Sequence, residues 1–228
     1  MAFVEKYDWG EKVWRGTDPK QLKLLKKGVK YWNDWVEEQE VRINLYKADL
    51  SGLDLTGAYL SGADLGKANL KNTNLSYAHL HDAQLDYSNL SGANLSDSKL
   101  KGADFLHANL SRANLFRAEM QRAQLEGADL TKAVLRRAKI SDGRLEKANL
   151  TGANLSACSL RYADLTGANL RGAKLVEADL CEANFTRTDL SRADLTGSDL
   201  EKAIFVETNL DNAVLTRCVE SMGCRRGR

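Results

Sequence analysis

An apolar side chain occupies every fifth position of the chain from Leu45 to Leu215. The register contains 35 positions: 30 are Leu, three are Phe, and the others are Met120 and Ile140. The residue two positions earlier is Ala in 25 cases, and the residue immediately before is Asp or Asn in 22 cases. The repeat therefore reads A-(D/N)-L-x-x.

Neither a helix nor a straight strand keeps these apolar positions on one side. In an α-helix five residues advance the chain by about 500°, so each leucine would move about 140° around the axis. In a strand side chains alternate, so apolar residues five apart would point to opposite faces. The chain must therefore turn once per pentad, and the turns must stack as a solenoid with the apolar side chains inside.

Longer regularities indicate four pentads per coil. Phe105, Phe185 and Phe205 are separated by multiples of four pentads, and the nine positions spaced four pentads apart from Asp49 to Asn209 are all Asp or Asn. Thirty-five pentads then form about nine coils at a strand spacing of about 4.8 Å. The sequence predicts an all-β solenoid, a four-sided β-helix. Its outward Asp and Asn side chains would bond turn amides, and glycine in the x-x positions would suit the turns.

The tandem A-(D/N)-L-x-x motif resembles the pentapeptide-repeat proteins, and the resemblance covers residues 41–217. It implies a right-handed quadrilateral β-helix, a fold common in bacteria and especially in cyanobacteria. The resemblance does not imply one activity. Among similar proteins, some imitate B-DNA in shape and charge and bind DNA gyrase, while others bind proteins as regulators.

Residues 1–40 differ from the repeats and are expected to form an N-terminal helical cap. We predict a helix over residues 19–39, with Gly28 as the place for a bend. Asp18, Pro19 and Gln21 suit the N-cap, N1 and N3 positions. An apolar stripe follows at Leu22, Leu25, Val29, Trp32 and Val36. The segment resembles the caps that precede the repeats in many bacterial members. It would be filled by all four tryptophans, with a ligand-stacking site as the alternative: Trp9, Trp14, Trp32 and Trp35.

Composition narrows the class of protein further. The 228 residues carry a formal net charge of +2 and contain no run of 18 apolar residues and no apolar N-terminal signal. We therefore expect a cytoplasmic protein that does not associate with membranes. After the β-helix of residues 41–217, residues 218–228 form a basic tail. CxxC spacing is lacking, so reduced thiols are expected rather than a zinc site at Cys158, Cys181, Cys218 and Cys224.

The sequence contains no pattern that predicts catalysis or a bound cofactor. Ser-His-Asp, Cys-His, Walker and GxGxxG arrangements are not found. His79 and His81 flank an inward leucine and, with Asp82, could hold a metal ion at the surface, but an ordinary solvated surface is the simpler interpretation. We expect a non-enzymatic protein with no cofactor and no metal.

Charge is distributed unevenly along the predicted rod. Residues 97–147 contain 11 Lys or Arg and 7 Asp or Glu, whereas residues 176–211 contain 3 and 9. Exposed aromatic and arginine side chains are typical of interfaces. We predict a partner-binding edge in the basic middle of the rod, with a merely solvated edge as the alternative. Its residues would be an exposed Phe116 with Arg117, Arg122, Arg136, Arg137 and Lys139.

Two functions are weighed on this basis. The leading hypothesis is a scaffold or regulator that presents a rigid β-helical rod to a protein partner and does not bind nucleic acid directly. The alternative is a DNA-mimicking modulator of DNA gyrase. Mimicry needs dense negative charge, and gyrase-protecting members commonly carry a loop that interrupts the repeat, which does not occur here. The first hypothesis is therefore preferred.

The C-terminal end of the rod is expected to form a homodimer. Ile204, Val206 and Val214 place apolar side chains at outward positions of the last coil. No helical lid is evident after Leu215, and gyrase-binding members of the family commonly dimerise through this end. Self-association would cover the exposed apolar surface.

Overall fold

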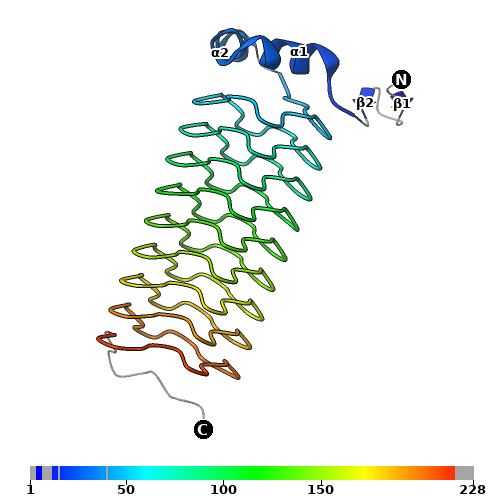
Figure 1. Ribbon diagram of the computed structural model, residues 1–228. Helices are drawn as coiled ribbons and strands as arrows, with labels where there is room; N and C mark the ends of the chain where they lie inside the picture. Colours follow the sequence, from blue (N-terminus) through cyan, green and yellow to red (C-terminus); the bar gives the residue numbers. More distant parts are fainter. Residues whose placement is uncertain (1–3, 7–11, 15, 40, 219–228) are drawn as a thin grey trace.

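The computed structural model describes residues 4–6, 12–14, 16–39 and 41–218. Strands β1 (Val4–Lys6) and β2 (Lys12–Trp14) pair antiparallel, and helices α1 (Pro19–Lys27) and α2 (Val29–Glu38) follow. The rest of the chain is a rod of stacked coils with α1 and α2 across its N-terminal end (Figure 1). Some positions lie outside the described residues: Trp9, the side chain of Trp14, and tail residues 219–228, including Cys224.

Each coil of the rod consists of four pentads, as predicted. Parallel bridges join equivalent residues of consecutive coils at every pentad, from Asn44↔Asp64 to Asp194↔Val214. The bridges form four ladders, which define four faces of the rod, and each ladder advances by one coil per step. Face A runs from Asn44 to Ile204, face B from Asp49 to Asn209, face C from Asp54 to Val214, and face D from Tyr59 to Asp199.

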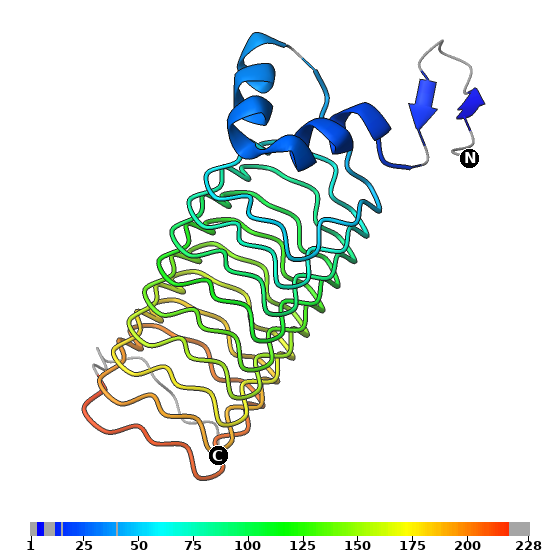
Figure 2. The ribbon, with the colours of Figure 1, turned by 45° about the horizontal axis from the view of Figure 1, so that its top comes forward.

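The four faces meet at four corners, and each corner contains two residues of every coil. Corner AB contains residues 46–47 and their equivalents in the later coils, corner BC residues 51–52, corner CD residues 56–57, and corner DA residues 61–62. Faces A and C are opposite each other, and so are faces B and D. Figure 2 shows the coils from nearer the N-terminal end, where the helices cover the first coil.

The inward Leu and Ala side chains form one continuous core along the rod. Full burial of a leucine contributes roughly 1.5–3 kcal/mol, and each coil buries four large apolar side chains only because its neighbours cover them. Hydroxyl residues at the Ala position find carbonyl partners: Thr73 Oγ1 donates to Leu50 O at 2.8 Å. Phe185 and Phe205 stack with ring centroids 5.2 Å apart, so the four-pentad spacing of these two phenylalanines has a direct structural reason.

The outward Asp and Asn residues of face B are required by the turns. Each of the nine side chains accepts a hydrogen bond from the backbone N–H two residues later, as Asn109 does from Ser111 N at 3.0 Å. A short side chain with an oxygen acceptor closes such an Asx turn, which a longer one does less well. The predicted role of these residues is confirmed.

The corners impose a second requirement that the repeat motif does not reveal. All 35 second corner residues have positive φ, and 25 of them are not glycine, with φ between 52° and 61°. A β-branched side chain is poorly tolerated in this left-handed region. Thr and Val occur nine times at the first corner position and never at the second. The backbone therefore selects the residue type at each corner position.

The cap differs from the single helix expected over residues 19–39. Gly28, with φ 137°, ends α1 and begins α2, so the bend is a break between two helices. Asp18 is the N-cap, as predicted, and its carboxylate accepts from the N–H groups of Lys20 and Gln21. Trp32 is fully buried against the first coils. Neither helix in the described part of the chain is long and apolar enough to cross a membrane.

Side chains of the cap bond backbone groups of the first coil. Gln21 donates through Nε2 to Arg42 O (2.9 Å) and accepts through Oε1 from Asn44 N (2.7 Å). Asn33 accepts from Tyr59 N (2.9 Å), and the indole N–H of Trp32 donates to Tyr59 O (2.8 Å). Unpaired strand edges readily recruit other chains. The cap replaces the missing preceding coil and covers such an edge.

The corner geometry predicts that two neighbouring arginines differ in how well they tolerate substitution by valine. Arg136 and Arg137 are both exposed, but only Arg137 has positive φ, at 58°. We expect Arg137→Val to lower the free energy of unfolding by about 1 kcal/mol more than Arg136→Val, and Arg137→Gly to raise it. Denaturant unfolding of the three variants tests this. Equal losses for the two valine variants would contradict the left-handed assignment.

The cap contacts predict that its removal exposes an adhesive edge without unfolding the rod. A chain that lacks residues 1–40 should keep a β-rich circular dichroism spectrum but associate in solution, because the partners of Arg42, Asn44 and Tyr59 are gone. Light scattering against the full-length chain measures this. A truncated chain that stays monomeric at high concentration would show that the cap is not needed as a cover.

Candidate groove at corner CD

Corner CD brings together most of the predicted partner-binding residues. Arg117 and Arg137 occupy equivalent positions in consecutive coils, Phe116 and Arg136 precede them, and Lys139 lies on the adjoining face D. A groove of about 390 Å³ runs along this side of the rod. Its lining residues are Tyr77, Asp97, Lys99, Arg117, Glu119, Arg137 and Lys139.

Phe116 is half-buried and not exposed as expected. Second corner residues with positive φ project outward, as the exposure of Arg117 and Arg137 illustrates. First corner residues vary in exposure, since Arg136, one coil after Phe116, is exposed. The exposed aromatic side chain of this groove is instead Tyr77, which is 60% exposed. The rule that second corner positions face solvent would have identified Tyr77 from its place in the repeat.

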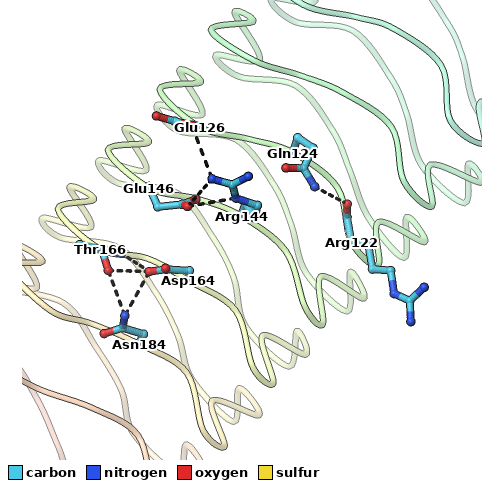
Figure 3. Close-up of polar contacts among 8 residues, drawn as sticks. All are labelled: Arg122, Gln124, Glu126, Arg144, Glu146, Asp164, Thr166 and Asn184. Carbon is cyan, nitrogen blue, oxygen red and sulfur yellow. Dashed lines mark hydrogen bonds and ion pairs between the residues drawn. The ribbon is translucent and has the colours of Figure 1, made fainter.

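Arg122 does not belong to the groove, which corrects the expectation that it shares an edge with Arg117. Each pentad advances the chain by a quarter of a coil, so Arg122 lies at corner DA, beside face A (Figure 3). There its carbonyl accepts from Gln124 Nε2 at 3.0 Å. On the same face Arg144 Nη2 pairs with Glu146 at 3.0 Å and Glu126 at 3.9 Å.

Two ion pairs between coils neutralise part of the groove. Arg117 pairs with Asp97 at 3.1 Å, and Lys139 pairs with Glu119 at 2.9 Å. The hydrogen bond from Lys139 holds the pKa of the Glu119 carboxyl below its usual range, against the opposing effect of its partial burial. Three of these four side chains have substantial solvent access, and only Asp97 is largely covered, so the pairs contribute little stability. Among the described residues Arg137 forms no ion pair, which leaves its charge available.

Face D, which adjoins the groove, departs furthest from the repeat. Face B has Asp or Asn at all nine ladder positions, but face D has Asp at only two of eight. The other side chains of the face D ladder are Tyr59, His79, Lys99, Glu119, Lys139 and Ser159. Six of the eight positions are thus occupied by residues that the Asx turns do not require. Sorting the outward positions coil by coil distinguishes face D from face B in the sequence alone.

The structure places His79, one of the three residues suggested as metal ligands, against an aromatic side chain. His79 stacks on Tyr59 with ring centroids 4.9 Å apart. Burial lowers the pKa of His79, and Lys99 and His81 lower it further. Within residues 4–6, 12–14, 16–39 and 41–218, no three His, Cys, Asp or Glu side chains form a group that could hold a metal ion.

The C-terminal end of the rod exposes the three predicted apolar side chains. Ile204 is 46% exposed, Val206 53% and Val214 44%. Backbone N–H groups in the rod donate to carbonyls of the following coil, as in Leu195 N to Val214 O at 2.8 Å. For residues after 199 such partners would lie beyond residue 218, outside the described residues. Phe205, Leu210 and Leu215 are only partly buried.

Comparison with known proteins identifies the family. The sequence model of the pentapeptide repeats matches in eight copies between residues 41 and 219. The chain belongs to this family, whose members form right-handed quadrilateral β-helices. A search of curated proteins found no match.

Several solved structures are similar. HetL, a pentapeptide-repeat protein involved in heterocyst differentiation regulation in the cyanobacterium Nostoc, is 31% identical over 89% of this chain and 94% of its own, with a TM-score of 0.49. Rfr23 from the cyanobacterium Cyanothece is 30% identical over 53% of this chain and 66% of its own, with a TM-score of 0.32. A trypsin-treated variant of QnrB1, a plasmid-mediated fluoroquinolone resistance protein, is 24% identical over 79% and 91%, with a TM-score of 0.50.

Proposed function

We propose that the protein is a non-enzymatic, cytoplasmic scaffold or regulator that binds a protein partner through the groove at corner CD. The observation that carries this proposal is the concentration of side chains without a turn-forming role around the groove, which both the exposed Tyr77 and the available charge of Arg137 line. Tyrosine and arginine are the residues that interfaces favour. The continuous repeat provides a rigid support for such a surface.

The alternative of DNA mimicry finds less support in the charges. A gyrase surface that neutralises phosphates would meet Arg117, Arg136 and Arg137 along corner CD, and like charges repel. The similarity to QnrB1 is below 25% identity and concerns the fold alone. We therefore expect no inhibition of gyrase supercoiling by this protein at micromolar concentration.

The proposed groove predicts a partner interaction that depends on position as well as on charge. Arg136→Glu with Arg137→Glu should weaken capture of the partner from native extract at least about tenfold, because like charge would then face an acidic surface. The matched control is Arg122→Glu with Lys147→Glu, which makes the same change in net charge at the corners beside face A. Affinity capture with quantitative mass spectrometry and melting temperatures for all variants provide the measurement. Equal loss in both variants, or inhibition of gyrase by the parent, would refute the proposal.

We also propose that two copies of the chain associate through their C-terminal ends. Ile204, Val206 and Val214 provide the apolar contact, and a second copy would cover the partly buried residues of the last coil. Ile204→Lys with Val214→Lys should shift the protein to a monomer without loss of secondary structure. Analytical ultracentrifugation measures the shift. A parent chain that is monomeric at millimolar concentration would count against this interface.

A further inference from the structure

A second groove, of about 430 Å³, lies at corner BC in the same coils. Its lining residues are Lys71, Asn72, Ser91, Gly92, Ser111, Arg112, Asp129, Thr131 and Lys132. The side-chain oxygen of Asn72 lies against Gly92, where a Cβ would clash with it. Asp129, the acidic residue of this groove, accepts hydrogen bonds from Thr131. Among the described residues Arg112 and Lys132 form no ion pair.

Face C lies between the two grooves and is strongly basic over four coils. Segments 71–77, 91–97, 111–117 and 131–137 contain six basic residues and one acidic residue, Asp97, which pairs with Arg117. The opposite face A is acidic in the same region. Its segments 81–87, 101–107, 121–127 and 141–147 contain four basic and six acidic residues. The net charge thus differs between opposite sides of the rod, +5 beside face C and −2 beside face A, although basic residues occur on both sides.

The ladder residues of face C form the floor between the two basic corners, BC and CD. This floor offers few free polar groups. Asn114 Nδ2 donates to Asn94 Oδ1 at 2.9 Å, and Asn94 Nδ2 donates to Asn74 Oδ1 at 3.0 Å. The amides of this ladder therefore bond to one another. The next ladder position is Val134, which is half-buried, as is Phe116 at the edge of the face. The middle of face C can contact apolar side chains, while both of its edges attract negative charge.

We propose that face C binds an extended acidic peptide segment with apolar residues at its centre. This inference rests on the proposed function and assigns a chemistry to its partner. Successive side chains of an extended chain point to opposite sides, so two adjacent glutamates reach one basic corner each. Four coils span about 15 Å at a spacing of about 4.8 Å, a length covered by roughly five extended residues.

The surface suits a peptide better than a nucleic acid. The basic region is short and is followed by acidic coils, with 9 acidic and 3 basic residues in residues 176–211, which would repel a longer polyanion. A duplex also presents phosphates and sugars at its backbone, and these give Val134 and Phe116 no apolar group to cover them. An acidic peptide with apolar central residues can pair with the basic residues of both corners and contact the apolar side chains between them.

The purified full-length chain and three synthetic peptides test the proposal by fluorescence anisotropy. The peptide Glu-Glu-Leu-Phe-Glu-Glu should bind, Gln-Gln-Leu-Phe-Gln-Gln should not, and Glu-Glu-Gly-Gly-Glu-Glu should bind more weakly because it lacks apolar side chains. A short DNA duplex of random sequence is the competing probe. Equal binding of the Glu and Gln peptides, or tighter binding of the duplex than of the first peptide, would overturn the proposal.

Variants then locate the binding surface. Arg112→Glu with Lys132→Glu, which leaves corner CD untouched, should lower affinity for the first peptide at least about tenfold. The control pair Arg122→Glu with Lys147→Glu has the same net charge and should change it less than about twofold. Equal loss in both pairs would mean that only net charge attracts the peptide, and the site on face C would be wrong.

The peptide assay and the capture experiment test different residues, so failure of this inference can be distinguished from failure of the proposed function. Capture of the native partner tests corner CD through Arg136 and Arg137, whereas the peptide assay tests corner BC through Arg112 and Lys132. If capture is insensitive to the first pair but peptide binding is lost with the second, the groove at corner CD is wrong and face C stands. If capture is lost with the first pair but peptide binding is insensitive to the second, the protein-binding function stands and the acidic peptide is not its ligand.

Discussion

Stacking of inward leucines from one coil to the next is the interaction on which the whole molecule depends. A single coil leaves its apolar side chains open on two sides, so its burial comes entirely from its neighbours. The backbone hydrogen bonds between consecutive coils form only when the coils are held in this register. Any opening of the stack loses both, which explains why the first coil carries a cap with its own hydrogen-bonding side chains.

The same constraint divides the outward positions into those set by the turns and those left for recognition. On face B every ladder residue closes an Asx turn, so its identity is needed by the backbone. On face D most ladder residues, such as Tyr59, Lys99 and Glu119, are not Asp or Asn and are not required by Asx turns. Left-handed second corner residues add outward positions from which Tyr77 and Arg137 reach solvent. A rigid core thus supports a surface whose chemistry is set face by face.

The arrangement of the coils decides where the charged residues lie on the surface of the rod. Along the sequence the basic residues of 97–147 are mixed with acidic ones, and the excess is modest. Folding gives the side of face A a small acidic excess, with Glu126 and Glu146 around Arg144 (Figure 3). It gives the side of face C a clear basic excess. A small net charge is therefore compatible with one strongly basic face, which is the property relevant to a binding partner.

The sequence by itself determined the coil of four pentads, the inward positions and the helix start at Asp18, because period and capping are local properties of the chain. It did not determine which predicted interface residues are neighbours. One pentad is a quarter turn, so Arg122 leaves the edge of Arg117, while Arg137, one full coil later, lies directly beside it. Phe116 is half-buried although Arg136, at the same corner position one coil later, is exposed, so place in the repeat does not fix the exposure of a first corner residue. Gln21 serves the first coil instead of the helix, since an unpaired edge lies within its reach. These outcomes depend on contacts between segments that are distant along the chain, which only the tertiary structure supplies.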